Sequence, residues 1–317
     1  MITNSIEDAA VKLKNNELIA IPTETVYGLA ANAYSELAVQ KIFDLKKRPA
    51  YNPLIVHIKS SNQLNDVAKD IPEKAIILAK HFWPGPLTLV LKKQNHIPDL
   101  VTASKDTVAI RVPNHPITLQ LLDKLDFPLA APSANPFGSI SPTCAQHVLN
   151  YFSDKLEIIL DGGPCEKGIE STIIGFENNE PVLYRLGSTS TDEIEKLIGK
   201  VAFYKNKQNE IKAPGMLSRH YAPKTETFLT NDVKALTKSF PDKKIGLLLF
   251  QDHSFETKNV FKEILSSNGN MAEAAKNLYA ALHRLDKAGF DLIIAEKFPN
   301  EGLGKSINDR LERATKK

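Results

Sequence analysis

The sequence predicts an α/β protein with two domains, of which the first is a twisted, mixed open sheet with helices packed on it. Three observations point to this fold. Short apolar runs typical of buried strands alternate with segments of helical periodicity between residues 5 and 197. The length of 317 residues exceeds what one hydrophobic core usually supports. The polar stretch 205–212 has almost nothing to bury, so we interpret it as a linker.

Prolines and capping residues mark where the elements of the first domain begin and end. Pro22 ends the first strand, and Ser35 is a suitable N-cap for the helix that follows. Pro49 breaks that helix after its basic end, and Pro72 is expected at the N1 position of the next one. The predicted helices cover 5–15, 35–46, 72–83, 115–125 and 192–197, and the predicted strands cover 18–21, 54–58, 87–91, 107–112, 128–131, 158–160, 171–175 and 182–186.

A second, smaller α/β domain is predicted after the linker. The segment just before it, residues 213–223, reads A-P-G-M-L-S-R-H-Y-A-P. This segment is too specific in sequence to serve only as a linker. We place the first domain at residues 1–204, a linker and lid at 205–223, and the second domain at 224–317. The predicted strands of the second domain cover 227–229, 245–250 and 292–295, and its helices cover 231–239, 271–288 and 307–313.

Composition restricts the classes of function. The net charge of +3 is small for this length, which argues against a strongly basic nucleic-acid-binding coat. Cys144 and Cys165 form no C-x-x-C pair, and the eight histidines show no metal-binding spacing. The N-terminal residues do not resemble a signal peptide, and no apolar run approaches the roughly 20 residues that span a bilayer. We therefore expect a soluble cytoplasmic protein with no membrane partner and no protein-built metal site.

Polar and basic side chains gather at the ends of neighbouring predicted elements. Residues 23–25 (Thr-Glu-Thr) follow the first strand, and residues 46–48 (Lys-Lys-Arg) end the next helix, close to Asn52. Open α/β sheets keep their ligand crevices at such ends. Three cations indicate an anion, most simply a polyphosphate. The alternative is a solvated helix end whose cations interact with the helix dipole.

Arg111 is expected at the end of a buried strand, where a cation needs a partner. A carboxylate held through two parallel N–H bonds would satisfy it, which is how arginine recognises acids. An ion pair with an internal acid is the alternative. Thr107, four residues earlier, shares the same strand face by the two-residue period.

Seven sequence blocks follow one another between residues 22 and 187. They are P-T-E-T-V-Y-G-L (22–29), L-K-K-R-P-A-Y-N-P-L (45–54), F-W-P-G-P-L-T-L-V-L (82–91), V-A-I-R-V-P (108–113), A-P-S-A-N-P-F-G (131–138), D-G-G-P-C-E-K-G-I-E-S-T-I-I (161–174) and Y-R-L-G (184–187). In content and order these blocks resemble the YrdC-domain family, the threonylcarbamoyl-AMP synthases.

The resemblance implies a YrdC-like fold for the first domain and a small Rossmann-like fold for the second. It also implies an enzyme that forms threonylcarbamoyl-AMP and pyrophosphate from L-threonine, bicarbonate or CO₂, and ATP. Mg²⁺ would arrive with ATP, held mainly by phosphate oxygens. The product would supply a separate transferase that modifies tRNA, so tRNA or that transferase is a candidate partner.

The same resemblance assigns roles to individual residues. It implies catalytic roles for Lys46 and Arg48. It implies L-threonine contacts from Thr25, His57, Arg111, Ala131 (through its backbone) and Ser171. It implies ATP contacts from Arg48, Asn52, Thr107, Ser133, Asn135, Ser141, Arg185 and Tyr221. From the residues alone, Thr25 could equally be a cap, His57 a packed residue and the loop at 133–141 a structural turn.

Two other readings of the sequence stay open. An RNA-binding module could grip an RNA backbone with the cluster at 46–48 and turn over no ATP, although few aromatic residues are interleaved with the basic ones. A carbamoyl-phosphate-dependent transferase is disfavoured because no zinc-finger or acylphosphatase segment accompanies the domain.

The segment 299–306 imitates a P-loop, but Pro299 stands where the first Gly is required.

We also expect residues 218–222 to fold over the nucleotide as a lid. A carbamate is labile in water, so excluding solvent would protect it. No covalent enzyme intermediate is expected, because positioning and charge neutralisation carry phosphoryl chemistry of this kind.

Overall fold

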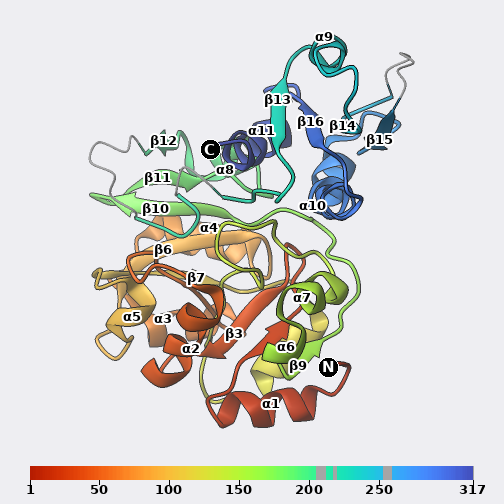
Figure 1. Cartoon of the computed structure of the whole chain (residues 1–317). Coiled ribbons are helices and arrows are strands. Elements are labelled where there is room, and N and C mark those ends of the chain that lie inside the picture. Colours follow the sequence, from red (N-terminus) through yellow and green to blue (C-terminus); the bar gives the residue numbers. More distant parts are fainter. Residues whose placement is uncertain (205–211, 217–219, 253–258, 317) are drawn as a thin grey trace.

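The computed structural model describes residues 1–204, 212–216, 220–252 and 259–316. A large mixed sheet and a small parallel sheet confirm the predicted α/β class, and Figure 1 shows the small sheet with its helices above the large one. In spatial order the large sheet contains β1 (Ile2–Thr3), β9 (Ile158–Leu160), β2 (Ile19–Ile21), β3 (Gly28–Asn32), β8 (Leu129–Ala130), β4 (Ile55–His57), β7 (Thr107–Arg111), β6 (Leu87–Lys93), β10 (Thr172–Glu177), β11 (Glu180–Arg185) and β12 (Ala202–Phe203), with β5 (Ala68–Lys69) beside β6.

Helices cover the large sheet because its strands alternate apolar side chains between the two faces. The helices of this part are α1 (Ile6–Lys14), α2 (Glu36–Lys46), α3 (Leu64–Val67), α4 (Glu73–Phe82), α5 (Asp99–Thr102), α6 (Pro116–Asp123), α7 (Ala145–Phe152) and α8 (Thr191–Ile198), with 3₁₀ turns at Ser61–Gln63 and Ser153–Lys155. Val56 and Ile110 point to the face that α2, α4, α7 and α8 cover. Ile19 and Ile21 point to the opposite face, where α1 and α6 pack. At the centre of the sheet, no helix of the described residues packs on this second face in the way that α1 and α6 do. The cavity described below lies there.

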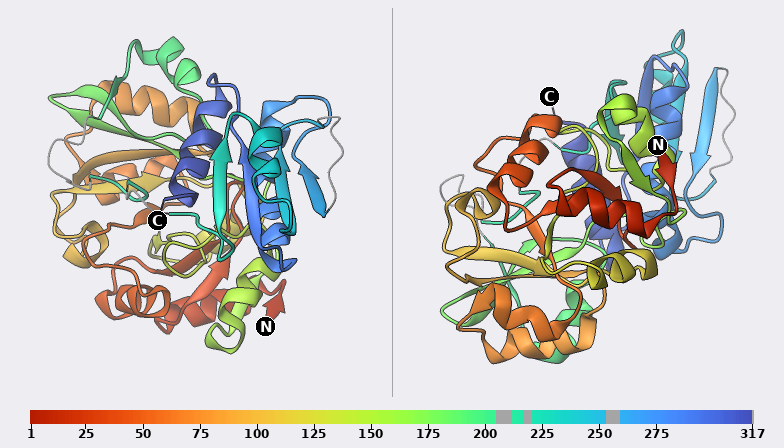
Figure 2. Two further views of the ribbon diagram at one scale, coloured as in Figure 1. Left: turned by 45° about the horizontal axis from the view of Figure 1, so that its top comes forward. Right: turned by 90° about the horizontal axis from the view of Figure 1, so that it is seen from below.

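The second domain is built on four parallel strands, in the order β13 (Thr227–Thr230), β16 (Leu292–Glu296), β14 (Ile245–Leu249) and β15 (Val260–Ile264). Helices α10 (Met271–Lys287) and α11 (Leu303–Ala314) pack on one face of this sheet, and α9 (Val233–Lys238) packs on the other. Both views in Figure 2 and Figure 1 place α11 on the side of the small sheet that faces the first domain. The two parts are in contact there, since Ser306 of α11 donates to the carbonyl of Gly187 at 2.9 Å.

The elements differ from the predictions in a few places. The sequence pattern did not predict β3, α7 or β15, nor the short elements β1, β5, β12, α3 and α5. Strand β3 (G-L-A-A-N) is rich in alanine and glycine, which carry no strand preference. Pro72 is the N-cap of α4 rather than its N1 residue, so the predicted N1 position is wrong. Ser35 is the N-cap of α2 as predicted, because its side chain accepts from the N–H of Ala38.

The predicted domain boundaries stay a prediction. The large sheet ends at Phe203 and the small sheet begins at Thr227. Residues 205–211 and 217–219 of the predicted linker lie outside the described residues. Within the described residues, no helix combines the length and apolar character that crossing a bilayer requires.

Candidate active site

A cavity lies at the centre of the large sheet, on the face opposite α2 and α4. The two-residue alternation of β4 and β7 turns His57 and Arg111 toward it, and these two residues pair in the parallel register of the strands. Pro214, Gly215, His220 and Tyr221, which come after Lys212 in the sequence, also line the cavity. The lining residues are Thr23, Thr25, Val26, Gly28, Arg48, Leu54, Ile55, His57, Arg111, Ala131, Pro132, Ser133, Glu170, Ser171, Arg185, Pro214, Gly215, His220 and Tyr221.

Arg111 lines this cavity and is also paired with an internal acid, so both sequence alternatives describe part of its environment. Its Nη2 lies 2.6 Å from Oε2 of Glu24, and both side chains are almost fully buried. Nη1 donates to Oγ1 of Thr25 at 3.0 Å, and Nε donates to the carbonyl of Gly85 at 3.2 Å. The guanidinium is therefore fixed from behind, with its plane held in one orientation.

Burial and the neighbouring arginine both favour the neutral form of His57. Burial first, and the charge of Arg111 second, lower the pKa of His57 to about 3. The imidazole is therefore neutral at neutral pH. A neutral ring beside Arg111 leaves the arginine as the positive group of this end of the cavity.

Lys46 does not line the cavity, although the resemblance implied a catalytic role. Its Nζ donates to the carbonyl of Ser133 at 2.6 Å and also to the carbonyl of Asn135. Burial, and then the charge of Arg48, hold the pKa of Lys46 well below its ordinary value. In this structure Lys46 fixes the loop that carries Ser133, which does line the cavity.

Arg48 faces the cavity and Asn52 lies behind it. Arg48 donates through Nε to the carbonyl of Asn52 at 3.1 Å and through Nη2 to the carbonyl of Pro53 at 2.7 Å. Burial, followed by the charge of Arg185, lowers the pKa of Arg48 to about 9. Lys46 and Arg48 are 2% and 8% exposed, so the interpretation as a solvated helix end is wrong for these two cations, whereas Lys47 is exposed. A crevice that grips an RNA backbone would also need them at the surface.

The remaining predicted ATP residues are divided between the cavity and its surroundings. Asn135 is fully buried, and its amide donates to the carbonyls of Pro136 and Ser139, which is the structural role open to a turn residue. Ser141 is also buried and donates to Oε1 of Glu170 at 2.7 Å. Neither side chain lines the cavity.

Thr107 is not brought into the site. It begins β7 whereas Arg111 ends it, so at the strand rise the two lie roughly 13 Å apart despite sharing a face. Thr107 lines a separate, open surface cavity together with Lys92 and Tyr184. The predicted nucleotide contact from Thr107 therefore has no support from this geometry.

Ser171 and Arg185 form one hydrogen-bonded unit in the cavity wall. Arg185 donates through Nη2 to the carbonyl oxygen of Ser171 at 2.7 Å and to its Oγ at 3.1 Å. Oγ of Ser171 also lies 2.7 Å from Oγ1 of Thr88. Among the described residues, Ser171 forms no hydrogen bond with a His or Asp side chain, which agrees with a binding role rather than a nucleophilic one.

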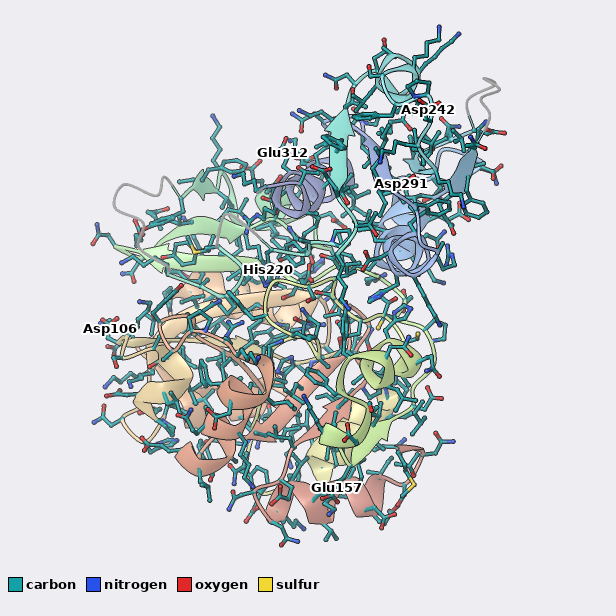
Figure 3. All side chains as sticks on the ribbon, viewed as in Figure 1. Asp106, Glu157, His220, Asp242, Asp291 and Glu312 are labelled. Atoms are coloured by element: carbon teal, nitrogen blue, oxygen red, sulfur yellow. The ribbon has the colours of Figure 1, made fainter. Side chains whose placement is uncertain are left out.

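The segment after the linker contributes His220 and Tyr221. His220, labelled in Figure 3 between the two domains, donates its backbone N–H to the carbonyl of Arg313 in α11. Tyr221 is 1% exposed, and its hydroxyl has no hydrogen-bond partner among the described residues. A buried hydroxyl in a cavity wall, free to bond a ligand, is what the predicted ATP contact requires. Residues 218 and 219 of the predicted lid lie outside the described residues.

Several residues of the site were missed by the sequence reasoning. Glu24 and Glu170 each pair with a buried arginine. The rule that a buried arginine needs an acidic partner could have pointed to both residues. Arg310 could not have been found this way, because it belongs to α11 and meets Glu170 across 140 positions of sequence. For His220, the sequence offered no indication of a role except its position in the segment 213–223.

Comparison with known proteins agrees with the fold and the sequence blocks. A family profile described as "Telomere recombination" matches residues 11–187, and one described as "Threonylcarbamoyl-AMP synthase, C-terminal domain" matches residues 189–315. The threonylcarbamoyl-AMP synthases of Pyrococcus abyssi and Bacillus subtilis are 44% and 40% identical, each over 98% of this chain and over 94% and 92% of the relative. A crystal structure of P. abyssi Sua5 complexed with L-threonine matches with a TM-score of 0.91 and 42% identity, over 99% of this chain and 97% of that one.

These matches cover both domains and confirm the predicted family. The chain belongs to the threonylcarbamoyl-AMP synthase family, in the two-domain form that Sua5 represents.

Proposed function

We propose that this chain converts L-threonine, bicarbonate or CO₂, and ATP into threonylcarbamoyl-AMP and pyrophosphate in the cavity described above. The observation that carries the proposal is the presence of Arg111, Arg48 and Arg185 in one cavity wall. Arg111 is suited to the carboxylate of an amino acid, and the other two to a polyphosphate. A relative crystallised with L-threonine supports threonine as the amino acid.

In the proposed mechanism, the nitrogen of threonine attacks CO₂ and loses a proton, which gives a carbamate. An oxygen of the carbamate then attacks the α-phosphorus of ATP in line, and the bond to the bridging oxygen of the β-phosphate breaks. Pyrophosphate leaves with that oxygen. Arg48 and Arg185 would stabilise the charge that develops on the phosphates, while Arg111 and Ser171 hold the amino acid. Lys46 would act by fixing the loop of Ser133.

Mg²⁺ is proposed to enter with ATP and to be held mainly by phosphate oxygens, where it would neutralise charge on the leaving pyrophosphate. The two carboxylates near the cavity, Glu24 and Glu170, are already committed to arginines. No group of three His, Cys, Asp or Glu side chains suited to a metal occurs in the described part of the chain. The residues therefore fit a metal that arrives as part of the nucleotide complex.

The proposed place of the chain is the cytoplasm, where its product would pass to a transferase that modifies tRNA. The burial of Lys46 and Arg48 argues against the alternative of an RNA-binding module without ATP turnover. We propose that His220 and Tyr221 belong to a lid over the nucleotide, because both line the cavity from the segment that follows the linker.

Pyrophosphate release tests the proposed function directly. Release should depend on both L-threonine and bicarbonate, and the adenylate should be recovered with the amino acid attached. Release that proceeds without either substrate would contradict the assignment. RNA binding that falls steeply with salt, together with no ATP turnover, would favour the binding module.

A further inference from the structure

A buried carboxylate stands in the wall of a cavity that we propose admits a polyphosphate. Glu170 is 7% exposed, lines the cavity and directly precedes Ser171. Arg185 also acts on it electrostatically from the same wall. An unpaired carboxylate at this position would repel the phosphates of ATP, because charges interact strongly at low dielectric constant.

The groups that neutralise Glu170 come mainly from the second domain. Arg310 of α11 donates through Nε to Oε2 at 2.9 Å, and the hydroxyl of Tyr279 in α10 lies 3.1 and 2.9 Å from the two carboxylate oxygens. From the first domain, the hydroxyl of Ser141 donates to Oε1 of the same carboxylate at 2.7 Å. Burial by itself raises the pKa of Glu170, but the charges of Arg310 and Arg185 outweigh it and lower the pKa to about 2. The carboxylate is therefore ionised under all working conditions and depends on its partners.

Arg310 is held in place by contacts with both parts of the protein. It is 1% exposed, and its Nη2 donates to the carbonyl of Leu186 at 2.7 Å. Its guanidinium carbon lies 5.1 Å from the ring centroid of Tyr221, within the range of a cation–π contact. Tyr221 in turn stacks on Tyr279, with 5.7 Å between ring centroids. One arginine of the second domain thus contacts two residues that line the cavity of the first.

We propose that Arg310 is a positioning residue for the ATP side of the cavity, which it serves by neutralising and orienting the carboxylate of Glu170. The inference rests on the proposed function, because it takes ATP as the ligand. It gives the second domain a defined part in the reaction: Arg310 supplies a counter-charge to Glu170 in addition to the charge of Arg185 from the first domain. Arg310 itself need not touch the substrate.

The test is a charge-removal cycle measured by pyrophosphate release. Arg310→Met should raise the KM for ATP by roughly tenfold or more, with a smaller change in the KM for L-threonine, because an unpaired buried carboxylate remains. Glu170→Gln in the Arg310→Met background removes that charge and should return the KM for ATP most of the way to the wild-type value. Arg284→Met removes an ion pair with Glu263 in the same domain, in which the arginine side chain is 58% exposed; it is the matched control and should leave both values unchanged.

The outcomes separate a charge effect from a structural one. An unchanged KM for ATP in Arg310→Met, or a double variant no better than the single one, would overturn the proposal. Should Arg310→Met fail to fold, Tyr279→Phe keeps the ring and removes one donor, and its KM for ATP should rise unless Glu170→Gln is also present. A wild-type protein with no threonine-dependent release would instead overturn the proposed function itself.

Discussion

Arg111 and Glu24 form a buried ion pair at the edge of the cavity, with 2.6 Å between Nη2 and Oε2. Glu24 does not line the cavity, whereas Arg111 does. The acid therefore holds the guanidinium from the side away from the ligand. An arginine prepared in this way can receive a second carboxylate without first losing side-chain freedom.

Glu24→Gln should destabilise the free protein by about 3 kcal/mol, because it leaves the buried charge of Arg111 unpaired. L-threonine should then stabilise the variant more than the wild type, since the carboxylate of the ligand supplies the missing anion. The midpoint of thermal unfolding with and without saturating L-threonine measures both effects. Glu180→Gln, which breaks an exposed pair with Lys74, should change the midpoint little. An equal shift by L-threonine in variant and wild type would contradict this account of Arg111.

Tyr221→Phe should weaken the use of ATP without weakening the fold. The hydroxyl is buried and has no partner in the described part of the chain, so its removal costs the free protein nothing and can raise the unfolding temperature. If it bonds the nucleotide, the KM for ATP should rise by roughly 5- to 30-fold, for about 1–2 kcal/mol. Tyr51→Phe, at an exposed tyrosine, is the control. A lower melting temperature with an unchanged KM would show that the hydroxyl is structural.

The sequence predicted most strands, the N-cap Ser35 of α2 and the family, because these depend on local patterns. The ends of predicted elements pointed to Arg48 and Arg111, and the family resemblance added Ser171; all three line one cavity. The nucleotide contact that the resemblance implies for Thr107 stays a prediction, because a shared strand face does not bring Thr107 close to Arg111 along the strand.

Lys46 illustrates a second limit of the sequence. Its place in a basic cluster pointed to an anion, but the fold turned its ammonium toward two carbonyls of the loop at 133–135. The pairing of Glu170 with Arg310 depends on the packing of two domains, for which no local pattern exists. Contacts of this kind join distant segments and become visible only in the folded chain.

Acid should destabilise the protein at a pH at which most carboxylates are still ionised. Burial lowers the pKa values of His57 and His220 to about 3, from an ordinary value near 6.5. At a pH between about 3 and 6.5, these two histidines are protonated in the unfolded chain but not in the folded chain. The free energy of unfolding therefore falls as the pH falls, by up to about 1.4 kcal/mol per pH unit for each histidine. Urea unfolding at several pH values measures the slope. His220→Gln should make the slope shallower, and an identical slope would show that His220 does not contribute.

Gly187→Ala should disturb the site through the backbone. A Cβ at this position would lie 2.3 Å from the carbonyl carbon of Ser171 and 2.3 Å from the nitrogen of Thr172, so the segment of Glu170 and Ser171, which leads into β10, would have to move. We expect a loss of stability of about 1–3 kcal/mol and at least a tenfold rise in the KM for L-threonine, since displacements near 1 Å are costly in an active site. Gly199→Ala meets no atoms within 4 Å but has a φ of +80°, so it should cost about 1 kcal/mol from backbone strain and leave the KM unchanged. If both variants lost stability equally and kept the wild-type KM, the close packing of Gly187 against Ser171 would have no part in holding the substrate.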